Sequence, residues 1–148
     1  MAHHRMVKAV YDEEAGTSTV ALSSQYGVFE HTVKVHENDM DVKNRFDGMN
    51  IAEGMCVRDI LKARMQTMRI RLDEAKHLYE VLCRQACAPL EYNYQAVDAI
   101  EQQVKVAERN YEKAKRDYEK TNENIGRNVH NLPKMRRQIR NTLEASPF

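Results

Sequence analysis

The chain has 148 residues, of which 42% are hydrophobic and 30% charged, with five Gly, three Pro and no Trp. This composition is typical of a protein built from long helices and argues against a disordered chain or a β-sandwich. No stretch approaches the roughly 20 apolar residues that a membrane span needs, so we expect no membrane partner. The first residues lack the apolar core of a signal peptide, and the three cysteines form no disulfide framework. We therefore expect a cytoplasmic-type reducing compartment, or a particle assembled there.

The two ends of the chain carry opposite charge, although the formal net charge is only +1. Residues 1–50 contain five Lys or Arg and eight Asp or Glu, whereas residues 127–148 contain five Lys or Arg and one Glu. Such polarity favours head-to-tail contacts between copies, or contact of the basic end with an anionic partner.

Residues 1–49 predict a small β-rich head that ends in a polar connector. Residues 6–11 alternate apolar and polar side chains, a turn-like stretch follows, and residues 17–22 form a β-branched return strand. Residues 28–35 alternate less regularly and complete a three-stranded antiparallel hairpin or meander. Three strands are about the minimum for a stable sheet, so we expect the helices or another subunit to cover its apolar face.

A heptad repeat of apolar residues dominates residues 50–126 and is interrupted once, at Pro89. This period lets helices pack along a shared seam, so we expect an antiparallel helical hairpin, a coiled coil, with its turn near 87–93. Asn50 with Glu53 fits a capping box that opens the first helix. The residues predicted to form the interaction seam are Leu61, Met65, Met68, Leu72, Tyr79, Leu82, Val97, Ile100, Val104, Tyr111 and Tyr118.

Folding the repeat back on itself at the break also predicts a register for the two helices. Met65 then lies opposite Ala114 and Met68 opposite Tyr111, so that large seam residues often face small ones. A register shifted by one heptad remains an alternative.

Residues 127–148 predict a kink followed by a short basic helix, about 132–144. Asn131 suits an N-cap, and Pro133 is tolerated in a first helical turn. Guanidinium groups donate two parallel hydrogen bonds and suit phosphates or carboxylates. No aromatic residue interleaves these charges for base stacking, so nucleic acid is the second choice of partner, behind an acidic protein surface. The proposed partner-binding residues are Arg127, Lys134, Arg136, Arg137 and Arg140.

We expect no catalytic residue, cofactor or metal site. Cys83 and Cys87 have the spacing of two zinc ligands, but zinc usually takes four, and Cys56 lies too far along the same helix. We interpret the pair as small thiols at the hairpin turn. The histidines show no arrangement with a nucleophile, and the chain has neither a glycine-rich phosphate loop nor a zinc-protease signature. An enzyme is therefore not expected.

The predicted turn carries a further candidate surface, because Leu90, Tyr92 and Tyr94 would form an apolar hairpin tip. An adaptor or inhibitor that grips a larger machine would use such a tip. This reading is one of two alternatives to the main prediction.

Taken together, these patterns predict an α+β fold, mainly α. A small N-terminal antiparallel β hairpin or meander precedes a long antiparallel helical hairpin and a short C-terminal helix. We expect a non-enzymatic structural or assembly subunit that makes protein–protein contacts in a larger homo- or hetero-oligomeric complex, of which a virus particle is one form. The other alternative is a nucleic-acid-associated accessory protein that uses the basic tail at residues 127–140.

Overall fold

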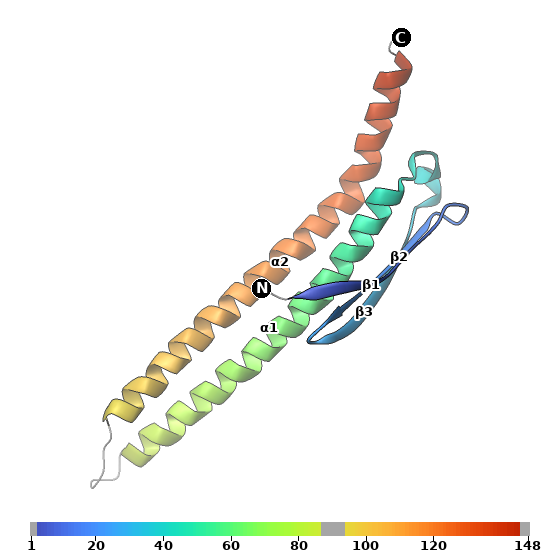
Figure 1. Cartoon of the computed structure of the whole chain (residues 1–148). Helices are drawn as coiled ribbons and strands as arrows, with labels where there is room; N and C mark the ends of the chain where they lie inside the picture. The colour runs from blue at the N-terminus through green and yellow to red at the C-terminus, as the bar shows by residue number, and fades with distance from the viewer. Residues whose placement is uncertain (1–2, 87–93, 146–148) are drawn as a thin grey trace. The chain divides into compact units, whose positions relative to one another are not determined.

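The computed structural model describes residues 3–86 and 94–145 (Figure 1). The strands are β1 (His4–Asp12), β2 (Thr17–Ser24) and β3 (Gly27–Lys34), and the helices are the 3-10 helix η1 (Glu37–Val42), α1 (Arg45–Ala86) and α2 (Tyr94–Ala145). A three-stranded antiparallel sheet followed by two long helices that pack together confirms the predicted fold class. The predicted turn at 87–93 lies outside the described residues.

The sheet has the strand order β1-β2-β3, with β2 paired antiparallel to both neighbours. In this register, Leu22 of β2 lies between Met6 of β1 and Phe29 of β3. Side chains alternate along a strand, so Ser18, Val20 and Leu22 share one face of β2, and all three are buried. The register shifts just after Met6, which is a β-bulge in the exposed edge strand β1.

The chain divides into two compact units. The head unit comprises Met1–Ile60 and Glu119–Phe148, and the arm unit comprises Leu61–Tyr118. The head unit contains the sheet, η1, the first turns of α1 and the end of α2. The described residues of the arm unit consist of helix alone.

The core of the head unit lies between β2 and the first turns of α1. Val20 and Leu22 of β2 form one buried cluster with Ala52, Cys56 and Ile60 of α1. These α1 residues recur every four positions, which places them on one face of the helix. The Cys56 thiol donates a hydrogen bond to the Val20 carbonyl at 3.2 Å, and burial raises the pKa of this thiol. Cys56 is therefore a packed core side chain.

Helix α1 begins earlier than the sequence predicts. Its cap is Asn44, whose side-chain oxygen accepts hydrogen bonds from the backbone N–H groups of Phe46 and Asp47 at 2.9 and 3.2 Å. The predicted capping box at Asn50 is wrong, because Asn50 lies inside the helix. Both asparagines suit a cap, and the earlier start places Asp47 in the first turn.

Helix α2 continues without interruption through residues 127–131, where the sequence predicts a kink between two helices. The predicted short C-terminal helix is the last part of α2 and not a separate element. Pro133 lies inside the helix, where its ring removes one backbone hydrogen bond. Tertiary contacts of the residues that follow override the low helix propensity of this stretch.

Contacts between α1 and α2 agree with the predicted register. In the head unit, a Cβ atom added at Gly54 would lie 3.4 Å from Ile125. In the arm unit, Arg69 contacts Tyr111, one position from the predicted partner Met68. A shift by a full heptad would separate both pairs.

Gly48 of α1 lies so close to Ser18 of β2 that a side chain at position 48 would collide with the serine hydroxyl. We expect Gly48→Ala to lower the free energy of unfolding by about 1–3 kcal/mol, because overpacking forces buried neighbours to shift. Urea unfolding of the two single variants and of the double variant with Ser18→Gly should show that the two positions are coupled.

Gly126→Ala in α2 is the matched control for this prediction. A Cβ atom at Gly126 meets open space, so the substitution should stabilise the protein by up to about 1 kcal/mol through helix propensity. Equal effects of the two glycine substitutions would contradict the close approach of α1 to β2.

Candidate functional site

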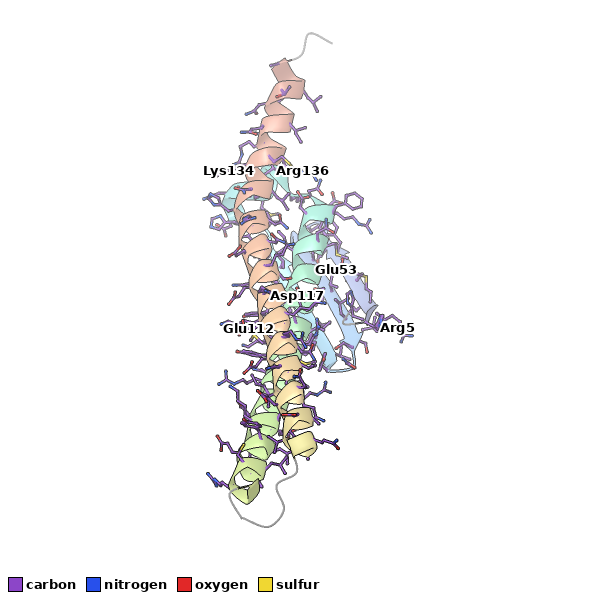
Figure 2. The ribbon with its side chains drawn as sticks, turned by 90° about the vertical axis from the view of Figure 1, so that its left-hand side faces the viewer. Arg5, Glu53, Glu112, Asp117, Lys134 and Arg136 are labelled. Atoms are coloured by element: carbon purple, nitrogen blue, oxygen red, sulfur yellow. The ribbon has the colours of Figure 1, made fainter. Side chains whose placement is uncertain are left out.

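The basic end of α2 binds acidic residues of the same head unit. Arg136 donates two hydrogen bonds to Asp47, from Nε and Nη2, each 2.8 Å long. Such bidentate pairs are among the strongest that arginine makes with a carboxylate. The Asp47 side chain is only 14% exposed and lies in the first turn of α1, where the helix dipole also favours negative charge. Figure 2 shows Arg136 and Lys134 on different sides of α2.

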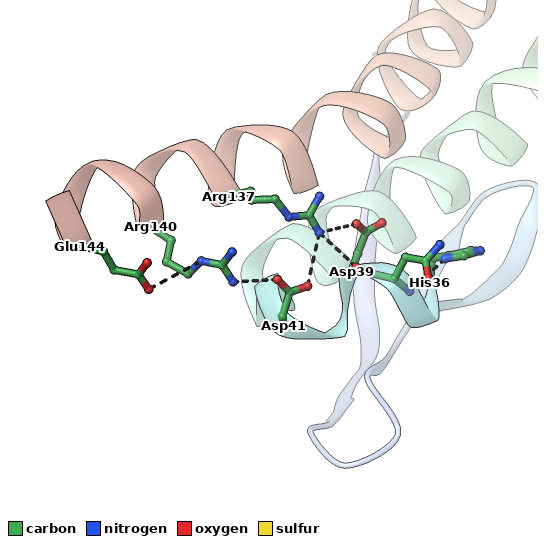
Figure 3. A network of polar contacts seen from close by, with 7 residues as sticks. His36, Asp39, Asp41, Arg137, Arg140 and Glu144 are labelled. Atoms are coloured by element: carbon green, nitrogen blue, oxygen red, sulfur yellow. Dashed lines mark hydrogen bonds and ion pairs between the residues drawn. The ribbon is translucent and has the colours of Figure 1, made fainter.

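Two further arginines bind η1, the segment just before α1. Arg137 donates hydrogen bonds to the Asn38 carbonyl at 3.1 Å and to the Asp39 carboxylate at 3.0 Å. Arg140 donates to Asp41 at 2.7 Å (Figure 3). Residues three and four apart lie on one face of a helix, so the arginines reach the head together. We name the following residues the arginine–aspartate cluster: Arg136, Arg137, Arg140, Asp39, Asp41 and Asp47.

The pairing within this cluster favours the charged form of its members. The hydrogen bond from Arg140 lowers the pKa of Asp41 below its usual value, and Arg137 adds to this effect. The hydrogen bond to Asp47 raises the pKa of Arg136. These three pairings therefore act as an electrostatic tie between the end of α2 and the head at neutral pH.

The other two predicted basic residues have partners within α2. Arg127 pairs with Glu123 at 3.5 Å, and Lys134 shares a hydrogen bond with His130 at 2.9 Å. The predicted basic surface thus separates into three arginines held by the head and two residues on the outside of α2. The opposite charge of the chain ends favoured a contact with another copy or an anionic partner, whereas the structure pairs three of these arginines with carboxylates of the same chain.

The predicted seam residues of the arm unit are all buried or half-buried. Leu72 and Val97 are 5% and 9% exposed, and Ala114 is fully buried. Two helices alone therefore leave most of their seam partly accessible to solvent or to a partner. The half-buried members are Leu61, Met65, Met68, Tyr79, Leu82, Ile100, Val104, Tyr111 and Tyr118.

Polar contacts beside the seam join the two helices of the arm. Arg64 lies 3.5 Å from Asp117, and the Arg69 guanidinium lies 5.5 Å from the centre of the Tyr111 ring. Long or exposed contacts of this kind contribute little to stability. These contacts hold polar side chains beside the seam, but they do not bury the apolar seam residues themselves.

Large apolar side chains are also exposed on the arm, at positions that the heptad repeat does not include. Ile70 and Leu78 of α1 are 58% and 45% exposed, and Val106 of α2 is 45% exposed. Val106 lines an apolar groove of about 290 Å³ together with Met68 and Ala107. The sequence analysis missed Ile70, Leu78 and Val106, because it followed only the row of heptad positions on each helix.

A polar pair that the sequence analysis also missed links the sheet to α1. His31 of β3 and Asp59 of α1 approach within 2.5 Å, and both side chains are about one-third exposed. His31 is the cross-strand partner of Val20, and both His31 and Asp59 lie near the Cys56 thiol. The pair therefore lies at the edge of the head core.

Two predicted sites extend beyond the described residues. Leu90, Tyr92 and the side chain of Tyr94, which form the predicted tip, lie outside them. Cys83 is half-buried, and its predicted neighbour Cys87 also lies outside the described residues. Within residues 3–86 and 94–145, no group of three His, Cys, Asp or Glu side chains is placed to hold a metal ion.

Comparison with known proteins gives no relative. A scan against protein-family models, a search of curated proteins and a search of solved structures each found no match. None of the helices in the described parts of the chain is long and apolar enough to cross a membrane. The function therefore has to be inferred from the surfaces of the chain itself.

The arginine–aspartate cluster predicts that Arg136→Lys lowers the free energy of unfolding by about 1–2 kcal/mol, because lysine keeps the charge but loses the bidentate hydrogen bonds. The matched variant Arg127→Lys changes an exposed pair and should shift stability by less than about 0.5 kcal/mol. Urea unfolding at constant ionic strength measures both. Equal losses would show that the Asp47 contact contributes no more than a surface pair.

The cluster also predicts a pH dependence for the end of α2. The pKa of Asp41 is lower in the folded protein, so its contribution is complete above the unfolded pKa of about 3.9 and is lost as pH falls through the folded value. Arg140→Gln should therefore speed amide hydrogen exchange in residues 137–145 at neutral pH. The difference from the wild type, after correction for intrinsic rates, should shrink as the pH falls below about 3.9 and should vanish only below the lowered pKa of the folded Asp41. A difference that stays undiminished as the Asp41 carboxylate becomes protonated would contradict the electrostatic tie.

Proposed function

We propose that this protein is a non-enzymatic structural subunit that makes protein–protein contacts in a larger complex. The observation that supports this proposal is the incomplete burial of the arm unit. Its two helices bury only Leu72, Val97 and Ala114 among their described hydrophobic residues. A component of a virus particle or similar shell is one concrete form of such a subunit.

The energetics of a two-helix arm favour partner helices from another chain. Ordering a residue costs about 1–2 kcal/mol of backbone entropy, and burial of apolar side chains has to offset that cost. The seam is half-buried, and Ile70, Leu78 and Val106 add apolar surface outside it. Helices of a second subunit packed against these positions would complete the core that the arm begins.

The two alternative functions have less support. Three of the four arginines proposed to bind nucleic acid already donate to Asp39, Asp41 and Asp47, so phosphates would have to compete there with carboxylates of the same chain. An adaptor that uses the hairpin tip depends on Leu90 and Tyr92, which lie outside the described residues. Both readings remain alternatives to the assembly function.

Light scattering after size-exclusion chromatography tests the self-assembling form of the proposal. The wild type should exceed its monomer mass of 17.3 kDa and gain mass with concentration. Ile70→Gln with Leu78→Gln should weaken association by at least about tenfold, because each buried side chain contributes about 1.5–3 kcal/mol.

The control variant carries Lys62→Gln and Glu80→Gln, two exposed changes on the same helix that leave the net charge unchanged. It should assemble like the wild type. A wild-type chain that stays at 17.3 kDa at every concentration would contradict self-assembly and favour an adaptor that needs a foreign partner.

A further inference from the structure

The apolar face of α2 that packs on α1 in the head unit extends beyond the start of α1. Ile125 is buried, and a Cβ atom at Gly54 would lie 3.4 Å from its side chain. Counting outward from this contact, Arg45, the first residue of α1, falls opposite Lys134. Since α2 continues to Ala145, its last turns extend past the start of α1 and have no α-helix beside them among the described residues.

Three exposed apolar residues continue this face. Met135, Ile139 and Leu143 are 41%, 45% and 69% exposed. They follow one another at intervals of four residues and so form a single row along the helix surface, which we name the apolar ridge. Rows of this kind are the ridges that interlock when two helices pack at a crossing angle of about −50°.

We propose that the apolar ridge docks on the apolar ridge of a second copy of this chain. In a two-fold crossing centred on Ile139, the two Ile139 side chains meet, and Met135 of each copy meets Leu143 of the other. A two-fold contact of this kind uses the same patch on both copies and is the commonest arrangement in homo-oligomers.

Charge around the ridge favours a second copy over an anionic or cationic partner. On one side of the ridge, Arg136 is bound to Asp47 and Arg140 to Asp41 of their own head unit, the latter pair shown in Figure 3. On the other side, helical geometry places the uncharged residues Gln138 and Thr142. Two copies of this surface can therefore approach through the described residues that flank the ridge without bringing unpaired arginines together.

The small area of the ridge means that it cannot hold two copies together alone. Three side chains per copy fall below the roughly 1,000 Å² of total buried area that a stable interface needs. The ridge is therefore a second contact that extends the proposed assembly function and depends on the arm for its strength. A chain with two different two-fold contacts links copies in succession, so removal of the ridge should leave discrete dimers joined through the arm, and removal of the arm should leave only the weak ridge contact.

Thiol crosslinking of the full-length chain tests this geometry. The background carries Cys83→Ser and Cys87→Ser and retains Cys56, which is buried. Ile139→Cys should crosslink to itself through a bis-maleimide of about 8 Å span, which matches the spacing of packed helices. A mixture of differently tagged Met135→Cys and Leu143→Cys chains should crosslink between the two variants. Both yields should exceed that of Asn141→Cys roughly tenfold, because docking raises the local thiol concentration.

Three outcomes would overturn the inference: equal yields at all four positions, preferential coupling of Met135→Cys to itself, or no crosslink at Ile139→Cys while circular dichroism shows normal helicity. The arm variant Ile70→Gln with Leu78→Gln, added to Ile139→Cys, separates this inference from the proposed function. A crosslink that survives in the arm variant at high protein concentration supports the ridge independently. Loss of mass in the arm variant, together with no Ile139→Cys crosslink in the chain whose arm is intact, would retain the assembly function and reject the ridge.

Discussion

The unequal length of the two helices is the constraint on which the rest of the head depends. Helix α1 has 42 residues and α2 has 52, so they cannot cover one another along their full length. A long amphipathic helix gains most of its stability from the packing of its apolar face. Beyond the start of α1, ionic contacts replace helix packing: Arg136, Arg137 and Arg140 hold the last turns of α2 to η1 and to the first turn of α1. These turns stay helical, but their apolar face is left without a cover.

The first turns of α1 connect the other parts of the head, because different faces of this short segment pack against different neighbours. Ala52 and Cys56 pack against β2, whereas Gly54 lies against Ile125 of α2. Gly48 permits the close approach of the sheet on the first of these faces. A disturbance of the sheet is therefore expected to reach the end of α2 through a few residues of α1.

The sequence pattern predicts the parts of this fold that depend on periodicity. Alternation indicated the strands, and the heptad repeat indicated two paired helices in a register that the Gly54–Ile125 contact supports. Features that depend on tertiary contacts could not be predicted in this way. Asn44 and Asn50 both suit a cap, and only the packed structure selects the first. The stretch before Pro133 has low helix propensity, yet the arginines beyond it are held in place and the helix continues. Composition located the charges at the two ends, but it could not tell whether the basic end meets its own head or that of a neighbour.

Whether the basic end binds its own head or that of a neighbour decides whether ionic or apolar contacts would drive the proposed assembly. If the acidic head of one copy bound the basic tail of the next, association would be electrostatic and would weaken as salt screens the charges. In this chain the three arginines are paired internally, so these charges stabilise the subunit itself. The surfaces left for partners are apolar: the half-covered arm with Ile70, Leu78 and Val106, and the ridge at the end of α2. Apolar burial is not screened by salt and is strengthened by excluded salts such as sulfate. Salt is therefore expected to act in opposite directions on the two kinds of contact, loosening the end of α2 from its head while favouring the proposed association of one copy with another.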